Sequence, residues 1–360
     1  MNFLEIEQYK ATKKRQYLSG FFVVIIVFFG LAMYEIGRVV ILRQDSPLQT
    51  FSHALTKLDT IYGGDIHAAA PVPEPPKLPV QIADLPGGEI FTAQAMLVKD
   101  VSSGTVLYSK NAYEQRPIAS LTKLMSALVV LERNPDWATS TQVVADDLID
   151  THMYAGDTYT LRDLWNAALI GSSNKAIMTV SDAVGWSREA FVSRMNTKAQ
   201  ELGMGDSIFF EPTGLDQGDV STASDLSLLL DEALLHPSIR QGLLTHEYNL
   251  YSEERDQAHH LWNTNWLLLG WVPNRLFDII GGKTGYIGAS GYNFMMQAQD
   301  EAGHVVSVVV LGADSHEARF TEARDIAQTV FENVVWPDDP DYESKILDSQ
   351  YTDNNEKEDS

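Results

Sequence analysis

The chain has no cysteine among its 360 residues. This absence excludes a disulfide framework, a thiolate metal site and a cysteine nucleophile. Basic residues are also few, because 26 Lys and Arg stand against 49 Asp and Glu, which gives a formal net charge of −23. A surface of this sign does not suit a phosphate backbone, so we expect no nucleic-acid partner.

Metal-ligand patterns are missing as well. The nine histidines show neither H-E-x-x-H nor H-x-H spacing, and His259 and His260 are adjacent. Neighbouring side chains point to different sides of a strand or helix, so this pair does not form a zinc site. The sequence therefore argues against a zinc peptidase, and we expect no metal and no cofactor.

Charge is also absent from the segment between Leu18 and Tyr34, whose centre, Phe21–Phe29, consists entirely of apolar side chains. Its 17 residues would span about 25 Å as a helix, and residues up to 42 extend it if Glu35 and Arg38 reach the interface together. We expect a membrane anchor at 18–42 after a cytoplasmic segment at 1–17. The flanking basic residues place the N-terminus inside, since Lys10, Lys13, Lys14 and Arg15 precede the run and Arg38 and Arg43 follow it.

A cleaved signal peptide is the alternative, but no small-residue A-x-A site follows the run at the usual distance. Residues 43–89 then form an extracytoplasmic stalk whose later part is rich in proline and glycine. Its segment from Pro71 to Pro79 favours an extended, semi-rigid spacer. At the other end, residues 337–360 carry nine acidic residues and two lysines, which predicts a disordered acidic tail.

The remaining segment, 90–336, alternates in a way typical of an α+β domain. Two short strand patterns come first, several helical patterns follow, and three strand patterns and a helix come last. We expect the early hairpin to join the late strands in one antiparallel sheet of about five strands. The predicted strands are 94–99, 105–109, 279–286, 292–299 and 304–311, and the predicted helices are 120–132, 161–170, 175–184, 187–202, 222–235 and 315–335.

Three short motifs carry candidate chemistry: Ser120-Leu-Thr-Lys123, Ser172-Ser-Asn174 and Lys283-Thr-Gly285. Each is weak by itself. Ser120 could simply cap a helix, and Lys175 forms a second S-x-x-K pattern with Ser172.

Physical arguments favour Ser120 as the nucleophile. Residues three apart share a helix face, so the Lys123 amine can meet the Ser120 hydroxyl. The apolar run after Lys123 indicates a buried helix, and burial disfavours the charged amine and makes it a proton acceptor. A serine at a helix start also lies beside free backbone N–H groups that can hold an oxyanion.

Taken in order, the three motifs resemble those of the active-site-serine penicillin-recognising enzymes. The chain is most similar to the serine-type D-alanyl-D-alanine carboxypeptidases, the low-molecular-mass penicillin-binding proteins. The resemblance covers about 90–335 and implies a β-lactamase/transpeptidase-like α+β fold with an all-helical lobe. Further matching blocks are Ile118–Lys123, Glu211–Leu215, Ser221–Asp225, Asn263–Asn265 and Gly282–Gly285 before Gly291–Asn293.

The resemblance also implies a role for each motif residue. Ser120 is the acylated nucleophile, Lys123 its general base, and Ser172 relays a proton to the leaving D-alanine. The substrate-binding residues are Asn174 for the amide, Lys283 and Thr284 for the terminal carboxylate, Gly285 within the motif, and Tyr286, whose backbone N–H joins that of Ser120 in an oxyanion hole.

The implied partners are peptidoglycan stem peptides ending in D-Ala-D-Ala, with β-lactams as inhibitors. With the predicted anchor, the catalytic domain lies outside the bacterial cytoplasmic membrane. Lys175 departs from the family pattern, in which an acidic residue often follows the asparagine, and the second β-rich domain of many relatives is not found. Cleavage of crosslinks by a DD-endopeptidase stays open. A β-lactamase, which needs a further glutamate, and a non-catalytic penicillin sensor are weaker alternatives.

Overall fold

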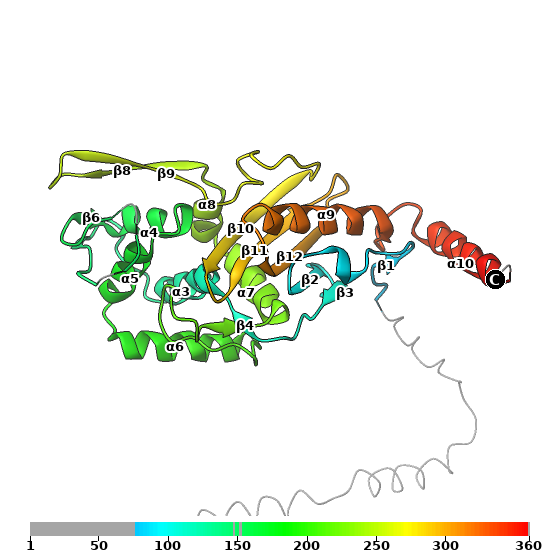
Figure 1. Cartoon of the computed structure of the whole chain (residues 1–360), viewed down its shortest axis with the longest axis horizontal. Helices are drawn as coiled ribbons and strands as arrows, with labels where there is room; N and C mark the ends of the chain where they lie inside the picture. The colour runs from blue at the N-terminus through cyan, green and yellow to red at the C-terminus, as the bar shows by residue number, and fades with distance from the viewer. Residues whose placement is uncertain (1–75, 147, 151–152, 359–360) are drawn as a thin grey trace, which may run out of the picture. The chain divides into compact units, whose positions relative to one another are not determined.

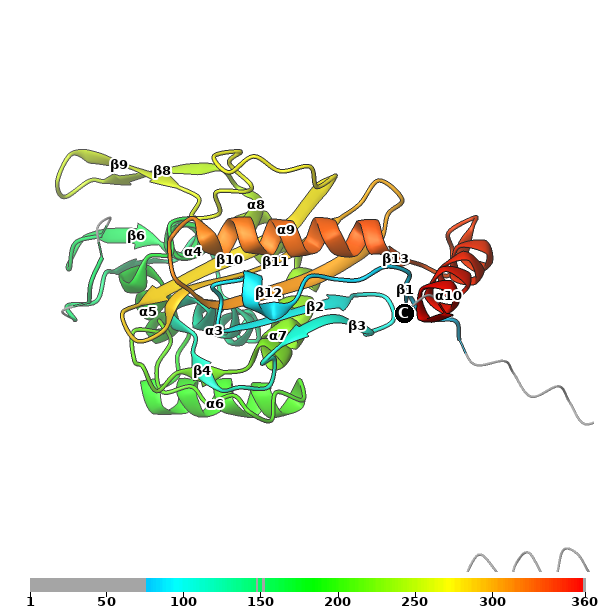
Figure 2. The same cartoon turned by 45° about the vertical axis from the view of Figure 1, so that its right-hand side comes forward.

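The computed structural model describes residues 76–146, 148–150 and 153–358, which are coloured in Figures 1 and 2. The predicted cytoplasmic segment at 1–17, the membrane anchor at 18–42 and the stalk up to residue 75 lie outside the described residues. Within the described ranges, no helix has the length and apolar character needed to cross a membrane.

A five-stranded antiparallel sheet forms the centre of the described part, as the sequence predicts. The strand order is β10-β11-β12-β2-β3, so the early hairpin continues the sheet of the three late strands through the β12–β2 pair. Val308 pairs with Val98 and Val310 with Met96 in that junction. The strands are β2 (Ala95–Asp100), β3 (Val106–Lys110), β10 (Asp278–Ile287), β11 (Gly291–Gln299) and β12 (Val305–Ala313).

Both faces of the sheet are covered, which explains why its central strands are apolar in sequence. Helix α9 (Ala318–Asn333) packs on one face, where its Phe320 is buried with Met96 and Val98. Leu97, the residue between these two, belongs to the other core with the remaining helices. Figure 2 shows α9 lying along the sheet. Successive side chains of a strand point to opposite faces of the sheet, so one strand contributes to two hydrophobic cores.

The helical part contains the helices that the sequence predicts, with boundaries within a few residues. Helix α4 begins at a capping box in which Thr160 and Asp163 exchange side-chain and backbone hydrogen bonds. Lys123 lies in α3, whose side chains are almost all buried. These elements are η2 (Ala119–Leu121), α3 (Thr122–Leu131), α4 (Leu161–Ile170), α5 (Asn174–Ala183), α6 (Arg188–Glu201) and α7 (Ala223–Leu235).

Several further elements were not expected from the sequence. Helix α8 (Pro237–Leu244) begins with proline in its first turn, where the missing N–H has no partner to lose. It leads into the β8–β9 hairpin, at the upper left of Figure 1. The other short elements are η1 (Gly88–Ile90), β4 (Arg116–Pro117), β5 (Ser140–Gln142), β6 (Thr158–Thr160), β7 (Val220–Ser221), β8 (Glu247–Ser252) and β9 (Gln257–Trp262).

Both ends of the described chain differ from the expectation. Strand β1 (Val80–Gln81) pairs with β13 (Val334–Val335), so the last residues of the predicted stalk belong to the peptidase unit. The described part of the predicted disordered tail, 337–358, also differs from the expectation, because α10 (Tyr342–Glu358) follows β13.

Local contacts explain this C-terminal helix. The buried Tyr342 donates a hydrogen bond to the Leu78 carbonyl at 2.8 Å, and Glu343 pairs with Lys77. Lys345 lies 3.1 Å from Asp341, an i,i+4 ion pair that supports a helix. Composition could not predict these contacts with the segment before β1.

Candidate active site

Ser120 lies in the 3-10 turn that leads into α3, and two glycines shape this turn. Ala119 has a φ of 51°, a left-handed conformation, and its carbonyl faces Gly214. A Cβ on Gly214 would lie 2.0 Å from the Ala119 oxygen, and one on Gly285 would lie 2.7 Å from the Ile118 oxygen. Only glycine permits this close approach, so the loops behind the turn hold Ser120 in place.

The Lys123 amine meets Ser120 as the spacing predicts. Its Nζ lies 2.8 Å from Ser120 Oγ, 2.6 Å from Asn174 Oδ1 and 2.7 Å from the Thr213 carbonyl oxygen. The amide and carbonyl oxygens can only accept, whereas the hydroxyl can also donate. A neutral amine that donates its two hydrogens to Asn174 and Thr213 directs its lone pair at the Ser120 hydroxyl.

Burial makes that neutral form accessible near neutral pH. The Lys123 side chain is fully buried, and desolvation lowers its pKa to about 7 even though Glu211, Asp150 and Asp219 act in the opposite direction. A large fraction of the amine is therefore unprotonated at pH 7 and can accept a proton.

The three residues of the second motif contact three different partners. Ser172 has a φ of 58°, and its Oγ accepts a 2.7 Å hydrogen bond from Lys283 Nζ. Ser173 turns away, caps α5 and donates to Asp150 at 2.5 Å. Asn174 faces Lys123. Ser172 and Asn174 thus connect the first motif to the third.

The third motif supplies a buried cation. Lys283 is 1% exposed, and desolvation, with Lys123 and Arg319 nearby, holds its pKa well below the usual value. Three basic side chains around one site, including the buried Arg319, favour an anionic ligand that would restore the charge on Lys283. Thr284 donates a 2.7 Å hydrogen bond to Thr264.

The backbone around Gly285 borders the nucleophile. A Cβ on Gly285 would come within 3.2 Å of the Ser120 nitrogen, so this strand runs directly past that N–H. The next residue, Tyr286, is 52% exposed and stacks on Tyr292 at a ring-centroid distance of 4.4 Å. All the motif residues named from the sequence therefore lie around one position.

Glu211 is a site residue to which the sequence assigned no role. Its carboxylate accepts hydrogen bonds from the Thr213 N–H at 2.7 Å, the Thr213 hydroxyl at 2.9 Å and the Leu215 N–H at 2.7 Å. This folds the loop that presents the Thr213 carbonyl to Lys123. Glu211–Leu215 was identified from the sequence as a block that matches the family, but no role was assigned to Glu211.

Asp219 and Thr264 were also missed. Asp219 is fully buried behind the nucleophile turn, its backbone oxygen accepts from the Ile118 N–H at 3.0 Å, and burial raises its pKa to about 7. Thr264 lies within the matched Asn263–Asn265 block, next to Thr284. Sequence separation conceals both contacts, since no local pattern connects these residues to the motifs.

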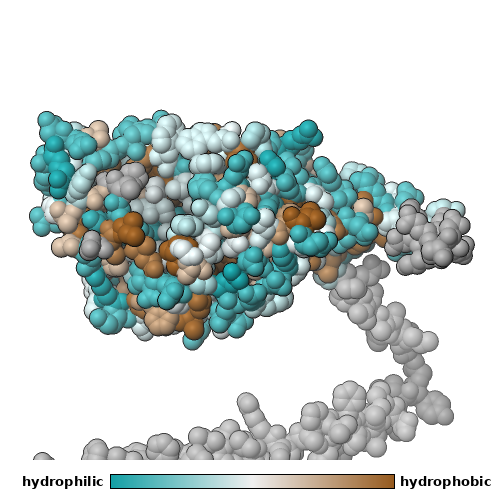
Figure 3. All heavy atoms as spheres, in the orientation of Figure 1, coloured by the Kyte–Doolittle hydropathy of each residue, from teal (hydrophilic) through white to brown (hydrophobic). Residues whose placement is uncertain are grey.

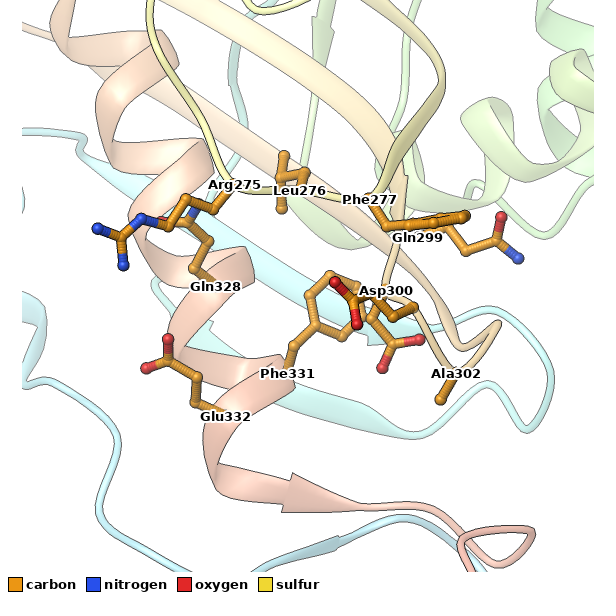
Figure 4. Close-up of a pocket in the computed structure, with 10 residues that line it drawn as sticks. Arg275, Leu276, Phe277, Gln299, Asp300, Ala302, Gln328, Phe331 and Glu332 are labelled. Atoms are coloured by element: carbon orange, nitrogen blue, oxygen red, sulfur yellow. The ribbon is translucent and has the colours of Figure 1, made fainter.

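A pocket of about 440 Å³ lies away from this chemistry. Figure 4 shows it between α9, the turn that joins β11 to β12, and the segment before β10. None of the three motifs contributes to this pocket. Its lining residues are Arg275, Leu276, Phe277, Gln299, Asp300, Glu301, Ala302, Gln328, Phe331 and Glu332.

Comparisons with known proteins agree with this geometry. The family described as D-alanyl-D-alanine carboxypeptidase, peptidase S11, matches residues 82–315. The chain is 32% identical over 254 residues to the D-alanyl-D-alanine endopeptidase of Pseudomonas aeruginosa, covering 69% of this chain and 79% of that protein. It is 30% identical over 257 residues to the D-alanyl-D-alanine carboxypeptidase DacF of Bacillus subtilis, covering 67% and 63%.

Solved structures show the same similarity. A penicillin-binding protein from Listeria monocytogenes in its ampicillin-bound form is 30% identical with a TM-score of 0.59, over 67% of this chain and 98% of that one. A mutant DD-transpeptidase from Streptomyces is 26% identical with a TM-score of 0.61 over the same shares. These matches confirm the penicillin-binding, transpeptidase-like α+β fold expected from the motifs. The family match spans more than half of the sequence and all three motifs, and the chain therefore belongs to the D-alanyl-D-alanine carboxypeptidase family.

Proposed function

We propose that this protein is a serine DD-peptidase that removes the terminal D-alanine from peptidoglycan stem peptides through an acyl-enzyme on Ser120. The observation that carries the proposal is the buried Lys123 amine at 2.8 Å from Ser120 Oγ, with its other two partners both acceptors. That arrangement is a serine nucleophile with its base already in hydrogen-bonding reach.

Acylation proceeds from this ground state. Lys283 and Thr284 bind the terminal carboxylate, and neutral Lys123 takes the proton of Ser120 as Oγ bonds to the carbonyl carbon of the penultimate D-alanine. The N–H groups of Ser120 and Tyr286 stabilise the oxyanion. The C–N bond then breaks, and Ser172 relays the proton from Lys123 to the departing amine.

Hydrolysis returns the enzyme to its starting state. Water loses a proton to Lys123 and attacks the ester carbon, the bond to Ser120 Oγ breaks, and the hydroxyl recovers the proton. A β-lactam acylates Ser120 in the same way, but its opened ring stays attached and blocks the water. The ampicillin-bound form of the Listeria relative supports this inhibitor class for the present chain.

Endopeptidase activity is the second candidate, because relatives with both names are equally similar. The Escherichia coli D-alanyl-D-alanine endopeptidase is 31% identical over 257 residues, and the E. coli carboxypeptidase DacC is 31% identical over 267. Both reactions use the same acyl-enzyme and differ in the leaving group, which is free D-alanine or the amine of a crosslinked second peptide.

Mass analysis of muropeptides after incubation with the protein tests both candidates. Loss of one alanine from pentapeptides means carboxypeptidase activity, and loss of crosslinked dimers means endopeptidase activity. If the catalytically intact protein changes neither, the proposed function is wrong. Ser120→Ala is the control and should change neither substrate.

We further propose that residues 18–42 anchor the protein in the bacterial cytoplasmic membrane with its catalytic domain outside. The uncharged run and the excess of basic residues before it support this topology. Protease treatment of intact spheroplasts should cleave the catalytic domain and leave a tag on the N-terminus protected. The reverse pattern would overturn the proposed orientation.

A further inference from the structure

Six aromatic rings form a row on the described part of the molecule, from the β8–β9 hairpin to the end of β10. Successive ring centroids lie 5.7, 5.7, 4.1, 5.9 and 4.4 Å apart. No residue outside the row is needed to connect them. We call this feature the aromatic row, and its members in order are Trp262, Trp271, Trp266, His316, Tyr292 and Tyr286.

The aromatic row borders the active site at two places. Tyr286 directly follows the Lys283–Gly285 motif, and Thr264, between Trp262 and Trp266, is hydrogen-bonded to Thr284. Three members are about half exposed: Trp262 at 49%, Trp271 at 51% and Tyr286 at 52%. Exposed aromatic surface continuous with a catalytic site is a candidate binding surface for a remote part of the substrate.

Packing and hydrogen bonds hold the rings of the aromatic row in place. The Trp266 ring stacks on the buried Phe320 with a centroid distance of 5.9 Å and an interplanar angle of 12°. The Asn265 side chain accepts from the Leu267 N–H at 3.1 Å, and the Trp271 N–H donates to the Trp266 carbonyl at 3.0 Å. A preformed surface of this kind binds with little ordering cost.

The aromatic row is also uncharged at neutral pH. Burial, with Arg319 adjacent, lowers the pKa of His316 to about 4. Arg319 can only donate, so its 2.7 Å contact makes His316 Nε2 the acceptor and leaves the hydrogen on the buried Nδ1. The groups on the row that can bond to a ligand are therefore the indole N–H and phenol O–H groups of its exposed members. Flat rings that also carry N–H and O–H groups suit a ligand with apolar faces and polar edges. A pyranose has that character, since its C–H face stacks on aromatic rings and its hydroxyl and acetamido groups take hydrogen bonds.

We propose that the aromatic row binds the glycan strand of peptidoglycan, a polymer of N-acetylated hexosamines, while the stem peptide attached to that strand reaches Ser120. This proposal rests on the proposed DD-peptidase function. A five-residue peptide extends to about 17 Å. The row proceeds from Tyr286 in steps of 4.1–5.9 Å, so one substrate can occupy both places.

A lipid surface fits the row less well. The hairpin that carries Trp262 has exposed Glu253, Glu254 and Asp256 in its turn, at the other end of its strands. Closer to the row, Glu247 is the strand partner of Trp262 and pairs with His260 beside that ring. Carboxylates at this position repel an anionic bilayer. Figure 3 shows that the face in view is mostly hydrophilic with separate small hydrophobic patches.

The test compares two soluble substrates on the full-length chain in detergent: a free D-alanyl-D-alanine pentapeptide and the same peptide linked to its disaccharide. The Trp262→Ala/Trp271→Ala double variant should lower the ratio of kcat/KM for the sugar-linked over the free substrate about tenfold, through KM. Each ring contributes a stacking contact, so either single variant should show a smaller decrease. Tyr251→Ala is the matched control, because Tyr251 lies on the same hairpin, is 52% exposed and is not in the row.

Direct binding provides a second readout. Glycan strands freed of stem peptides should sediment the wild-type chain and the Tyr251→Ala variant, but not the double variant. An unchanged ratio, an equal loss on both substrates, or an equal effect of Tyr251→Ala would overturn the proposal. So would Trp-dependent binding to phosphatidylglycerol vesicles with no binding to glycan strands.

These results separate the two proposals. If wild type cleaves the free peptide but neither retention on glycan nor a sugar preference is found, only the aromatic-row proposal is wrong. If glycan strands retain the chain in a Trp-dependent way but neither substrate is cleaved, the DD-peptidase function is wrong and the binding surface stands.

Discussion

Two regions of this molecule carry the same S-x-x-K spacing, and the structure uses them differently. At Ser120 the hydroxyl meets the buried Lys123 amine at 2.8 Å. At Ser172 the hydroxyl instead meets Lys283, 111 positions further along the chain, while its local partner Lys175 lies in the first turn of α5 and is half-buried. Spacing alone therefore does not make a catalytic pair.

The backbone before each lysine explains the difference. Ser120 and Lys123 lie in one continuous run of helical turns, which brings positions three apart to the same face. Ser172 precedes the N-cap of α5 and has a φ of 58°, so its side chain leaves the helix direction before the helix begins. Burial then suits Lys123 to act as a base, whereas Lys175 is only half-buried.

The largest expected effect tests this comparison directly. Ser120→Ala should abolish covalent labelling by a fluorescent penicillin, because Ser120 is the hydroxyl that meets the proposed base, Lys123. The Ser172 hydroxyl meets Lys283 instead, whose proposed task is to hold a carboxylate. Ser172→Ala should retain a label that peptide mapping places on Ser120. A label on Ser172 in either protein would reverse the assignment.

Substitutions of Lys123 and Lys175 should differ almost as strongly in their effect on the acylation rate. Lys123→Arg should slow acylation about 1,000-fold or more, since arginine stays protonated and cannot act as a base. Lys175→Arg, the matched change in the second pattern, should leave the second-order acylation rate within about twofold. Near wild-type acylation by Lys123→Arg would show that Lys123 is only a structural cation.

Lys283 should show a third behaviour, because its proposed task is to hold a carboxylate. Lys283→Arg should retain more activity than Lys283→Ala, whereas Lys123→Arg and Lys123→Ala should be equally harmful. Loss of the charge-assisted contact costs on the order of 2–4 kcal/mol, or roughly 30- to 1,000-fold in kcat/KM. Free-acid and amidated D-alanyl-D-alanine peptides measure this effect.

Wild type should strongly prefer the free acid, and Lys283→Ala should lose that preference. Equal turnover of both peptides by wild type would contradict the carboxypeptidase assignment. A preference that survives in Lys283→Ala would show that another group binds the carboxylate.

The smallest effect is a shift in pH dependence. The base must be neutral, and the pKa of Lys123 is about 7, so the acylation rate should rise with pH through this value and level off above it. Glu211→Gln removes a carboxylate that raises this pKa, so the midpoint should move to lower pH. A midpoint that moves upward, or does not move, would show that Glu211 acts only through the loop it holds.

Much of the fold follows from local patterns. The strand runs around residues 95–110 and 278–313 are short, apolar and separated by turn residues, and they form the five strands expected. Disorder was predicted for the C-terminal tail because its composition is that of a solvated segment. Helix α10 instead depends on contacts of Tyr342 and Glu343 with residues more than 260 positions earlier. Composition describes a segment by itself and contains no information about such partners.

The same distinction applies to the site. The sequence by itself determined the family, the order of the three motifs and the one-turn spacing of Ser120 and Lys123, because each is a property of neighbouring residues. Only the tertiary structure decided that Ser172 faces Lys283, that Glu211 holds the loop behind Lys123 and that six separated rings form one row. The pKa of Lys123 was also decided there, because desolvation depends on what packs around an amine, and that packing comes from segments far apart in the chain.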